Sequence, residues 1–294
     1  MVSLSSQVVV ITGGARGIGA AVARLLHKRG ATLVLVDVDA QPLAALAAEL
    51  ADDARVMTMT ADVRDLSAMQ GVIDKAVGRF GGIDVVVANA GVASYGSLLQ
   101  VDPEAFKRVM DVNVLGVFNT VRAALPSVID RQGYVLIVSS MAAFAAAPGM
   151  APYSTSKAGA EHLANALRLE VAYRGVKVGS AHMSWIDTDL IRDTKADLPV
   201  FGEMLAMAPW WPVNWTTSAD KCARAFVKGI EGRKTRVYCP SWVGLFRWLK
   251  PVLTSYVGET AMRQSAPALL PRMDAEVAAL GRSVSARTEA TDAS

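Results

Sequence analysis

The chain has 294 residues, of which 52% are hydrophobic and 19% are charged, and its formal net charge is +3. This length is ample for a large buried core, and so small a charge argues against nucleic acid as a partner. The two cysteines, Cys222 and Cys239, lack the close spacing of a redox or metal motif and indicate a reducing compartment. The three histidines have no metal-ligand spacing with acidic residues, so no metal site is predicted.

The N-terminus lacks the basic start and the long apolar core of a signal peptide. No apolar run reaches the roughly 18 residues that a membrane-spanning helix needs. We therefore expect a cytoplasmic protein, with peripheral contact to a membrane as the alternative discussed below for residues 240–258.

Short runs rich in β-branched residues alternate with longer helical patterns. The runs that we interpret as strands are 7–12, 32–37, 55–60, 83–88, 134–139 and 177–182, with a last strand at 234–239. The helical segments between them are 18–29, 41–50, 66–80, 104–130, 153–173 and 221–232. The strands are apolar on both faces, which is typical of a parallel sheet covered by helices on each side. The pattern predicts a Rossmann-like, doubly wound α/β fold in a single domain over residues 1–240.

The pattern changes after residue 184. Residues 184–216 mix a short helix with a loop rich in Pro and Trp, and we expect this segment to be the substrate loop. Residues 241–294 are expected to form a helical C-terminal extension. Its end, residues 282–294, is polar and low in bulky residues, which predicts a frayed tail.

The first predicted strand ends in "TGGARGIG", residues 12–19, and a helix follows. Gly13, Gly17 and Gly19 let the backbone turn tightly and approach an anion without Cβ atoms in the way. The N–H groups at the start of the helix, from Ile18 onward, can then hold a pyrophosphate. The alternative is a tight turn that needs glycine for its shape alone, but the order of strand, turn and helix favours a dinucleotide.

Asp37 ends the second predicted strand, where a carboxylate can accept hydrogen bonds from both ribose hydroxyls of a dinucleotide. A carboxylate at this position repels a 2′-phosphate, which favours NAD over NADP. Arg16, inside the glycine turn, favours NADP instead, because an arginine there can pair with a 2′-phosphate. No basic residue follows Asp37 directly, so NAD is the predicted cofactor and NADP the alternative.

Tyr153 and Lys157 stand four positions apart on one face of a predicted helix, among small residues. A neighbouring ammonium group favours phenolate and is expected to lower the pKa of the tyrosine toward working pH. Tyr153 is then suited to take a proton from an alcohol or to give one to a carbonyl. A surface tyrosine beside a solvated lysine is the alternative interpretation.

The spacing Gly-x-x-x-Gly-x-Gly, the "NAG" at 89–91 and the Tyr-x-x-x-Lys pair together resemble the classical short-chain dehydrogenase/reductase family over about residues 5–240. The resemblance implies an oxidoreductase that uses NAD or NADP. It also implies that Lys157 reaches the ribose next to the nicotinamide, and that the protein forms a homodimer or homotetramer.

The resemblance assigns further site residues. Ser140, thirteen positions before Tyr153, is expected to hold the reacting oxygen, and Asn113 is expected to hold a water that feeds protons to Lys157. The expected catalytic set is Asn113, Ser140, Tyr153 and Lys157. The further cofactor contacts that the resemblance implies are Asp62 and Val63 at the adenine, Asn89, Ala90 and Gly91 after the fourth strand, Ile186 after the sixth strand, and Thr188 at the carboxamide or phosphate.

One stretch departs from the family's pattern. Met183 and Ser184 stand where the family usually carries Pro-Gly after the sixth strand. Without the fixed φ of proline, the loop is expected to take a slightly different path while cofactor binding is kept.

The predicted substrate loop is rich in apolar and aromatic side chains. They are Met204, Met207, Pro209, Trp210, Trp211, Pro212 and Trp215. Such walls suit a hydrophobic alcohol or ketone, although aromatic loops also pack as ordinary cores. The predicted substrate is therefore a hydrophobic secondary alcohol or its ketone.

Residues 240–258 contain an apolar helical stripe flanked by cations. The stripe consists of Trp242, Leu245, Phe246, Leu249 and Leu253, with Arg247 and Lys250 beside it. We expect it to dock on its own domain or to cover a neighbouring subunit. Contact with a membrane surface is the alternative.

These observations predict an NAD(H)-linked oxidoreductase. The nearest alternative is an NADPH-dependent carbonyl reductase on the same scaffold. A second alternative, from another class, is a non-catalytic nucleotide-binding protein that keeps the fold.

Overall fold

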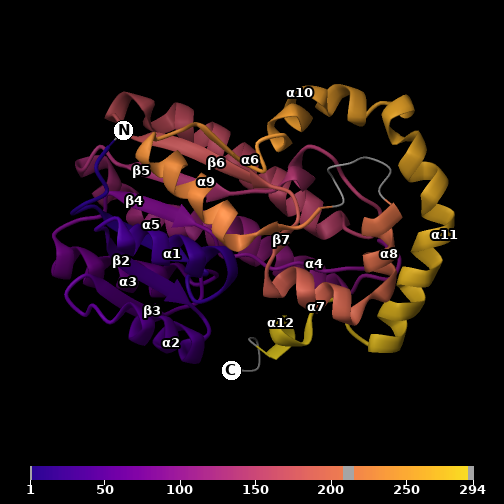
Figure 1. The fold of residues 1–294 in the computed structure, drawn as a ribbon, viewed down its shortest axis with the longest axis horizontal. Coiled ribbons are helices and arrows are strands. Elements are labelled where there is room, and N and C mark those ends of the chain that lie inside the picture. The colour runs from indigo at the N-terminus through magenta and orange to yellow at the C-terminus, as the bar shows by residue number, and fades with distance from the viewer. Residues whose placement is uncertain (1, 208–214, 291–294) are drawn as a thin grey trace.

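The computed structural model describes residues 2–207 and 215–290. Seven strands form one parallel sheet in the order β3-β2-β1-β4-β5-β6-β9 (Figure 1). The strands are β1 Val8–Thr12, β2 Thr32–Asp37, β3 Val56–Thr60, β4 Val85–Ala88, β5 Tyr134–Val138, β6 Lys177–Met183 and β9 Arg236–Cys239. The predicted doubly wound parallel sheet is thus confirmed.

Helices cover both faces of the sheet. The helices on one face are α1 Gly17–Lys28, α2 Ala40–Leu50 and α9 Ala219–Glu231, and those on the other are α3 Leu66–Phe80, α5 Gly116–Asp130 and α6 Ala151–Val171. Helix α4, Pro103–Met110, packs against α6. Val9 and Ile11 of β1 pack into the first layer, whereas Val8 and Val10 pack into the second. This alternation explains why the strands are apolar on both faces.

The segment 104–130 was predicted to be one continuous helix, and the structure corrects this. A π-helical turn, Asp111–Leu115, separates α4 from α5. Periodicity along the sequence does not reveal the wider turn, because apolar residues flank it on both sides. Among the described residues, Pro103–Asp130 is also the one stretch long and apolar enough to cross a membrane by composition, yet half of its most apolar window is buried.

The C-terminal third adds helices at one end of the sheet. After β6 come β7 Ile186–Asp187, α7 Asp189–Asp197, α8 Pro199–Met207 and β8 Thr217–Ser218, and after β9 come α10 Val243–Leu253 and α11 Tyr256–Leu280. In Figure 1, α10 and α11 run around this end of the molecule, and α11 lies beside α8. Leu269 and Met273 of α11 pack with Leu198 and Phe201 in a separate apolar core.

The expectation of a frayed tail is wrong for residues 282–290, which we call the C-terminal strap. Ser283, Val284, Ser285 and Thr288 are buried. The backbone N–H of Tyr95 donates to the carbonyl of Ser283 at 2.9 Å, and a short helix, α12 Ala286–Ala290, follows. Polar composition misled the prediction because these side chains and backbone groups are satisfied by protein groups rather than by water.

Candidate active site

Two adjoining cavities lie at the carboxyl edge of the sheet, where ligands of open α/β sheets bind. The first, of about 290 Å³, is lined by the ends of β1, β2 and β4 and by Lys157, and we call it the polar cleft. The second, of about 330 Å³, extends from Ser140 to α8 and α11, and we call it the apolar cavity. Tyr153 lines both cavities and so stands at their boundary.

The glycine turn forms the floor of the polar cleft. Gly13 and Gly17 adopt φ of +62° and +50°, a region that favours glycine, and a Cβ at Gly19 would collide with the carbonyl oxygen of Gly13. The side-chain amide of Asn89 donates to the carbonyls of Thr12 and Gly13, both at 3.0 Å. The turn is therefore fixed against the end of β4, and Gly13 and Gly17 line the polar cleft without side chains that would fill it.

Asp37 and Arg16 border this space on the side of β2. The carboxylate of Asp37 accepts from the backbone N–H of Ala15 at 2.9 Å and of Asp39 at 3.2 Å, and burial raises the pKa of Asp37. Arg16 is already paired, with Nη2 3.2 Å from Asp39 and Nη1 3.9 Å from Asp189. The 2′-phosphate of NADP would lie close to the carboxylates of Asp37, Asp39 and Asp189. Because these negative charges repel it, the geometry disfavours NADP.

The other residues expected to contact a cofactor fall into two groups. The polar cleft is lined by Ile18, Asp62, Val63, Ala90, Gly91 and Thr188, along with Gly13, Arg16, Gly17, Asp37 and Asn89. Gly19, which was also expected to contact the cofactor, does not line it. The carboxylate of Asp62 accepts from the backbone N–H and from Nε of Arg64, both at 2.8 Å, so it would have to share its acceptors with an adenine. Ile186, by contrast, is buried against the apolar cavity and does not line the cleft.

Lys157 and Tyr153 face the cleft from the first turns of α6. The amine of Lys157 lies 5.6 Å from the centre of the Tyr153 ring and donates to the carbonyl of Val138 at 3.2 Å. Burial raises the pKa of Tyr153, against an opposing hydrogen bond from Ser140, and burial lowers the pKa of Lys157 to about 8. The prediction that the lysine lowers the pKa of the tyrosine is therefore wrong for this structure, because loss of solvent dominates both groups.

Asn113 lies in the π-helical turn and is fully buried. Its amide oxygen accepts from the backbone N–H of Val92 at 2.9 Å, and its amide nitrogen donates to the carbonyl of Val92 and to Oγ of Ser156, both at 2.9 Å. Ser156 donates in turn to the carbonyl of Tyr153 at 2.8 Å. Asn113 thus ties the segment after β4 to the first turn of α6, next to Tyr153.

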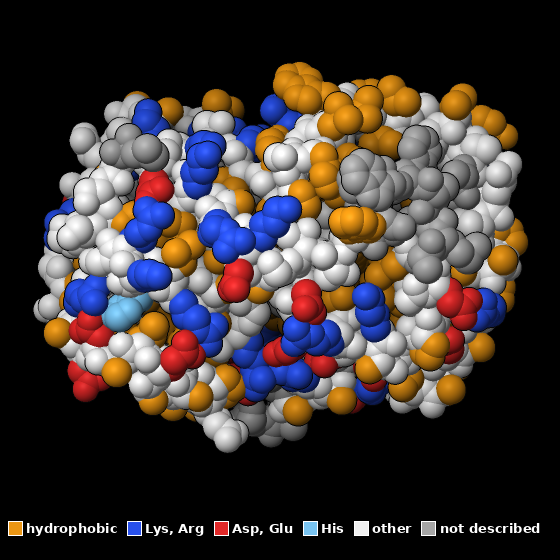
Figure 2. All heavy atoms as spheres, in the orientation of Figure 1, with side chains coloured by type: hydrophobic (Ala, Val, Ile, Leu, Met, Phe, Trp, Pro, Cys, Tyr) orange, Lys and Arg blue, Asp and Glu red, His pale blue; other side chains and the backbone are white. Residues whose placement is uncertain are grey.

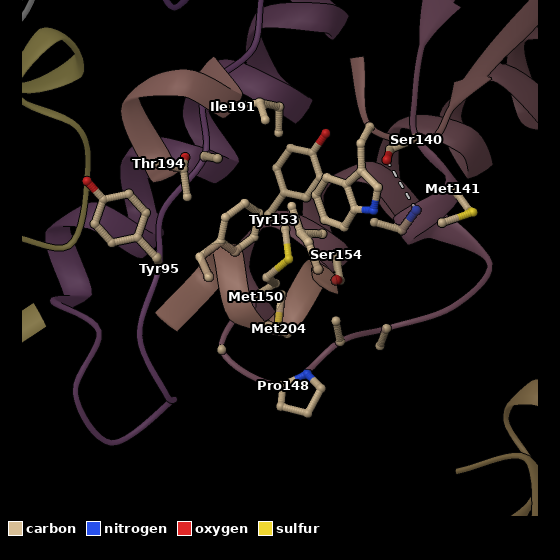
Figure 3. Close-up of a pocket in the computed structure, with 18 of the residues that line it drawn as sticks. Tyr95, Ser140, Met141, Pro148, Met150, Tyr153, Ser154, Ile191, Thr194 and Met204 are labelled. Atoms are coloured by element: carbon tan, nitrogen blue, oxygen red, sulfur yellow. Dashed lines mark hydrogen bonds between the residues drawn. The ribbon is translucent and has the colours of Figure 1, made fainter. Parts of the chain in front are cut away.

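Ser140 follows β5 and lies beside Tyr153 in the apolar cavity (Figure 3). Its Oγ accepts from the backbone N–H of Ala142 at 3.2 Å, which closes a short turn after the strand. Ser139 points elsewhere and donates to the carbonyl of Lys157 at 2.8 Å. This difference agrees with the alternation of side chains along a strand.

His182 contacts the backbone of Ser140, a role that the sequence did not reveal. Its Nδ1 lies 3.2 Å from the carbonyl oxygen of Ser140, and its ring stacks on Phe144 with centroids 4.5 Å apart. Burial lowers the pKa of His182 to about 3. On the other side of the ring, Nε2 lies 2.9 Å from Oγ of Ser180 and 3.1 Å from a carboxylate oxygen of Glu161. Sequence reasoning considered this histidine only as a metal ligand.

None of the described residues that line the apolar cavity carries a charge. Phe201 and Met204 of α8 form one wall and Leu269 and Met273 of α11 form another, and Figure 3 shows Met150 and Met204 near Tyr153. Of the predicted wall residues, Met204 lines the cavity, whereas Trp215 is 63% exposed and does not. Pro209, Trp210, Trp211 and Pro212 lie outside the described residues, and the side chain of Met207 is likewise not described.

Comparison with known proteins identifies the family. Residues 7–199 match the family model for short chain dehydrogenases. The chain belongs to this family. The expected resemblance and the expected oxidoreductase class are thereby confirmed, and the match ends near the start of α8.

Two relatives show how far this dehydrogenase resembles other sequences. It is 34% identical over 210 residues to a (-)-trans-carveol dehydrogenase of Rhodococcus erythropolis, covering 66% of this chain and 76% of the relative. It is 33% identical over 205 residues to an uncharacterised NAD-dependent oxidoreductase of Mycobacterium tuberculosis, covering 64% and 74% of the two chains.

Solved structures resemble this dehydrogenase over most of its length. A short chain dehydrogenase of Mycobacterium paratuberculosis bound to NAD superposes with a TM-score of 0.70 at 28% identity, covering 80% of this chain and 97% of the other. Levodione reductase superposes with a TM-score of 0.72 at 26% identity, covering 80% and 95%. These likenesses agree with the Rossmann-like architecture.

Proposed function

We propose that the protein interconverts a hydrophobic secondary alcohol and its ketone with NAD(H), and that Tyr153 is the acid–base group. The observation that carries the proposal is the place of Tyr153 between the polar cleft and the apolar cavity, with Ser140 on one side and Lys157 on the other. When bound, NAD supplies a nicotinamide that accepts or gives a hydride.

The residues of the polar cleft fit this cofactor. The glycine turn would hold the pyrophosphate, and Asp37 would accept from the ribose hydroxyls of the adenosine. The carboxylates of Asp37 and Asp39 favour NAD over NADP. The names of two similar proteins support this choice, since one is an NAD-dependent oxidoreductase and the other was solved with NAD.

The proton moves through residues of this chain. In the oxidation direction, the hydroxyl proton of the alcohol goes to Tyr153 while Ser140 donates a hydrogen bond to the reacting oxygen. Lys157 stabilises the phenolate that must receive this proton. Asn113 and His182 hold Tyr153 and Ser140 in place through the contacts described above.

The uncharged lining of the apolar cavity points to an uncharged substrate. The carveol dehydrogenase relative supports an alicyclic alcohol of this kind. The test is a screen of secondary alcohols with NAD⁺, followed by the absorbance of NADH. We expect turnover with uncharged alicyclic alcohols and little with hydroxy acids; reduction of neither NAD⁺ nor NADP⁺ by any alcohol would favour a non-catalytic nucleotide-binding protein.

A second proposal concerns the outer face of α10, which contacts an anionic membrane surface. Leu245, Trp248 and Val252 are 57%, 74% and 57% exposed, and this apolar face is visible over α10 in Figure 2. Arg247 and Lys250 flank it, and residues 240–258 contain no Asp or Glu. Only part of the predicted stripe docks on its own domain, since Phe246 lines the apolar cavity.

Charge favours lipid over a second copy of the chain at this face, because self-pairing would bring Arg247 and Lys250 close to their own copies. Co-sedimentation with anionic and neutral vesicles tests the proposal. We expect binding to anionic vesicles that is lost in Trp248→Ser and kept in Leu169→Ser, an exposed apolar position on α6. No sedimentation with vesicles, together with a dimer that Trp248→Ser dissociates, would assign the face to an interface between subunits.

A further inference from the structure

We propose that the C-terminal strap forms part of the binding site for the dinucleotide and that Arg287 is its cationic contact with the pyrophosphate. The proposal rests on the NAD binding proposed above. It concerns a segment that lies more than 80 residues beyond the end of the family match at residue 199.

The position of the strap is the first observation. Ser285, Arg287 and Thr288 line the polar cleft together with Gly13 and Gly17 of the glycine turn. Figure 1 shows α12 next to α7, although the two helices are almost one hundred residues apart in sequence. The strap therefore forms part of the wall of the cleft in which the cofactor is expected.

The first half of the strap is anchored firmly. Nη2 of Arg282 lies 2.6 Å from Asp197, and Oγ of Ser283 accepts from the backbone N–H of Asp102 at 3.1 Å. Val284 forms a β-bridge with Ser94 and is 4% exposed. These contacts fix the point from which α12 enters the cleft wall.

The second half of the strap combines buried polar contacts with charged contacts at the surface. Ser285 and Thr288 are buried, and Nη1 of Arg108 donates to the carbonyl of Thr288 at 3.2 Å. Arg287 is paired with two carboxylates of α7: its Nη1 lies 3.1 Å from Asp189 and its Nε lies 3.0 Å from Asp193. The side chain of Arg287 remains 39% exposed. Exposed ion pairs of this kind contribute little to stability, so the side chain of Arg287 can turn toward a ligand in the cleft while the buried part of the strap stays in place.

The charges around Asp189 indicate what Arg287 binds. Arg16 of the glycine turn and Arg287 of the strap approach the same carboxylate oxygen of Asp189, at 3.9 Å and 3.1 Å. A Cβ built on Gly17 would lie 3.2 Å from Cγ2 of Thr188, the residue before Asp189, so the glycine turn and the start of α7 are neighbours. An anion at this turn would sit among several carboxylates, and a mobile guanidinium is the group best suited to neutralise it.

The test compares Arg287→Ala with wild-type protein by NADH fluorescence. We expect the Kd for NADH to rise about tenfold or more, chiefly through faster dissociation in stopped-flow experiments, as for loss of one charge-assisted hydrogen bond. Binding of adenosine, which lacks the pyrophosphate, should be unchanged. Arg272→Ala is the matched control, because Arg272 makes a similar exposed pair with Glu203 away from the cleft.

Hydrogen exchange of the wild-type protein provides a readout that does not depend on a variant. Saturating NADH should slow the exchange of backbone amides in residues 285–290. Equal exchange with and without NADH, or an unchanged Kd in Arg287→Ala, would overturn the strap proposal while leaving the proposed function intact. Failure of the wild-type protein to bind NADH at all would overturn both.

Discussion

The amine of Lys157 lies 5.6 Å from the centre of the Tyr153 ring, where the two cavities meet. Lys157 is buried and Tyr153 is half-buried. Burial acts on the two groups in opposite directions, raising the pKa of Tyr153 and lowering that of Lys157 to about 8. Each shift disfavours the charged form that the proposed reaction uses. The site is therefore held in its catalytic geometry at some cost to the stability of the cofactor-free protein.

The first prediction concerns this cost. The pKa of Lys157 falls from 10.5 in a solvated lysine to about 8 in the fold. Between these pH values the unfolded chain retains a proton that the folded protein has lost, so stability rises with pH, and the full penalty is present below pH 8. Lys157→Met should therefore raise the free energy of unfolding at pH 7 by up to about 3 kcal/mol, at 1.36 kcal/mol per pKa unit.

Chemical denaturation of the cofactor-free proteins at several pH values measures this effect. The increase in the free energy of unfolding caused by Lys157→Met should shrink as the pH approaches 10.5. Turnover should be lost at every pH. A variant that is equally destabilised at pH 7 and pH 10 would contradict the assigned burial of the ammonium group.

A second prediction concerns cofactor choice. Asp37→Asn removes the negative charge at the end of β2 but keeps an acceptor for the N–H of Ala15. The ratio of the Kd for NADPH to that for NADH should fall about tenfold or more, which corresponds to about 1.4 kcal/mol. Fluorescence titration measures both constants, with Asp74→Asn on the exposed surface of α3 as the control. An unchanged ratio would remove Asp37 from the basis of cofactor selection.

A third prediction concerns the wall that α11 contributes to the apolar cavity. Met273 is 1% exposed and packs against the loop at Gly149. Met273→Ala should lower the free energy of unfolding by about 2 to 3 kcal/mol and improve kcat/KM for bulkier alcohols relative to smaller ones. Met273→Leu nearly conserves the volume and should change both quantities little. Loss of stability without any change in substrate preference would assign α11 a purely structural role.

The sequence predicted the sheet well because its strands are short, β-branched and apolar on both faces. It also indicated where Ser140, Tyr153 and Lys157 would meet, since the strand end and the helical spacing place them at one edge of the sheet. The π-helical turn at Asn113 was not predictable from periodicity. The helical C-terminal extension was predicted and is confirmed, but the bounds of α11 were not given, although Leu269, Met273 and Val277 recur at intervals of four residues and could have revealed them.

Two further differences have a common physical cause. The strap was taken for a frayed tail because polarity alone does not distinguish a side chain in water from one bonded to protein. The pKa of Tyr153 was expected to fall because the neighbouring cation is visible in the sequence, whereas the burial that outweighs it is not. In both cases the prediction was wrong because it used residue type, whereas solvent exposure decides the outcome.

The central claim is that Tyr153 moves the proton while NAD, bound in the polar cleft, exchanges the hydride. Single-turnover absorbance of NADH with Tyr153→Phe tests it most directly, after fluorescence has shown that the variant still binds NADH. We predict a rate at least about a hundredfold below that of the wild-type protein, with the Kd for NADH within about twofold. An equal rate of NADH formation in Tyr153→Phe and the wild-type protein would contradict the assignment.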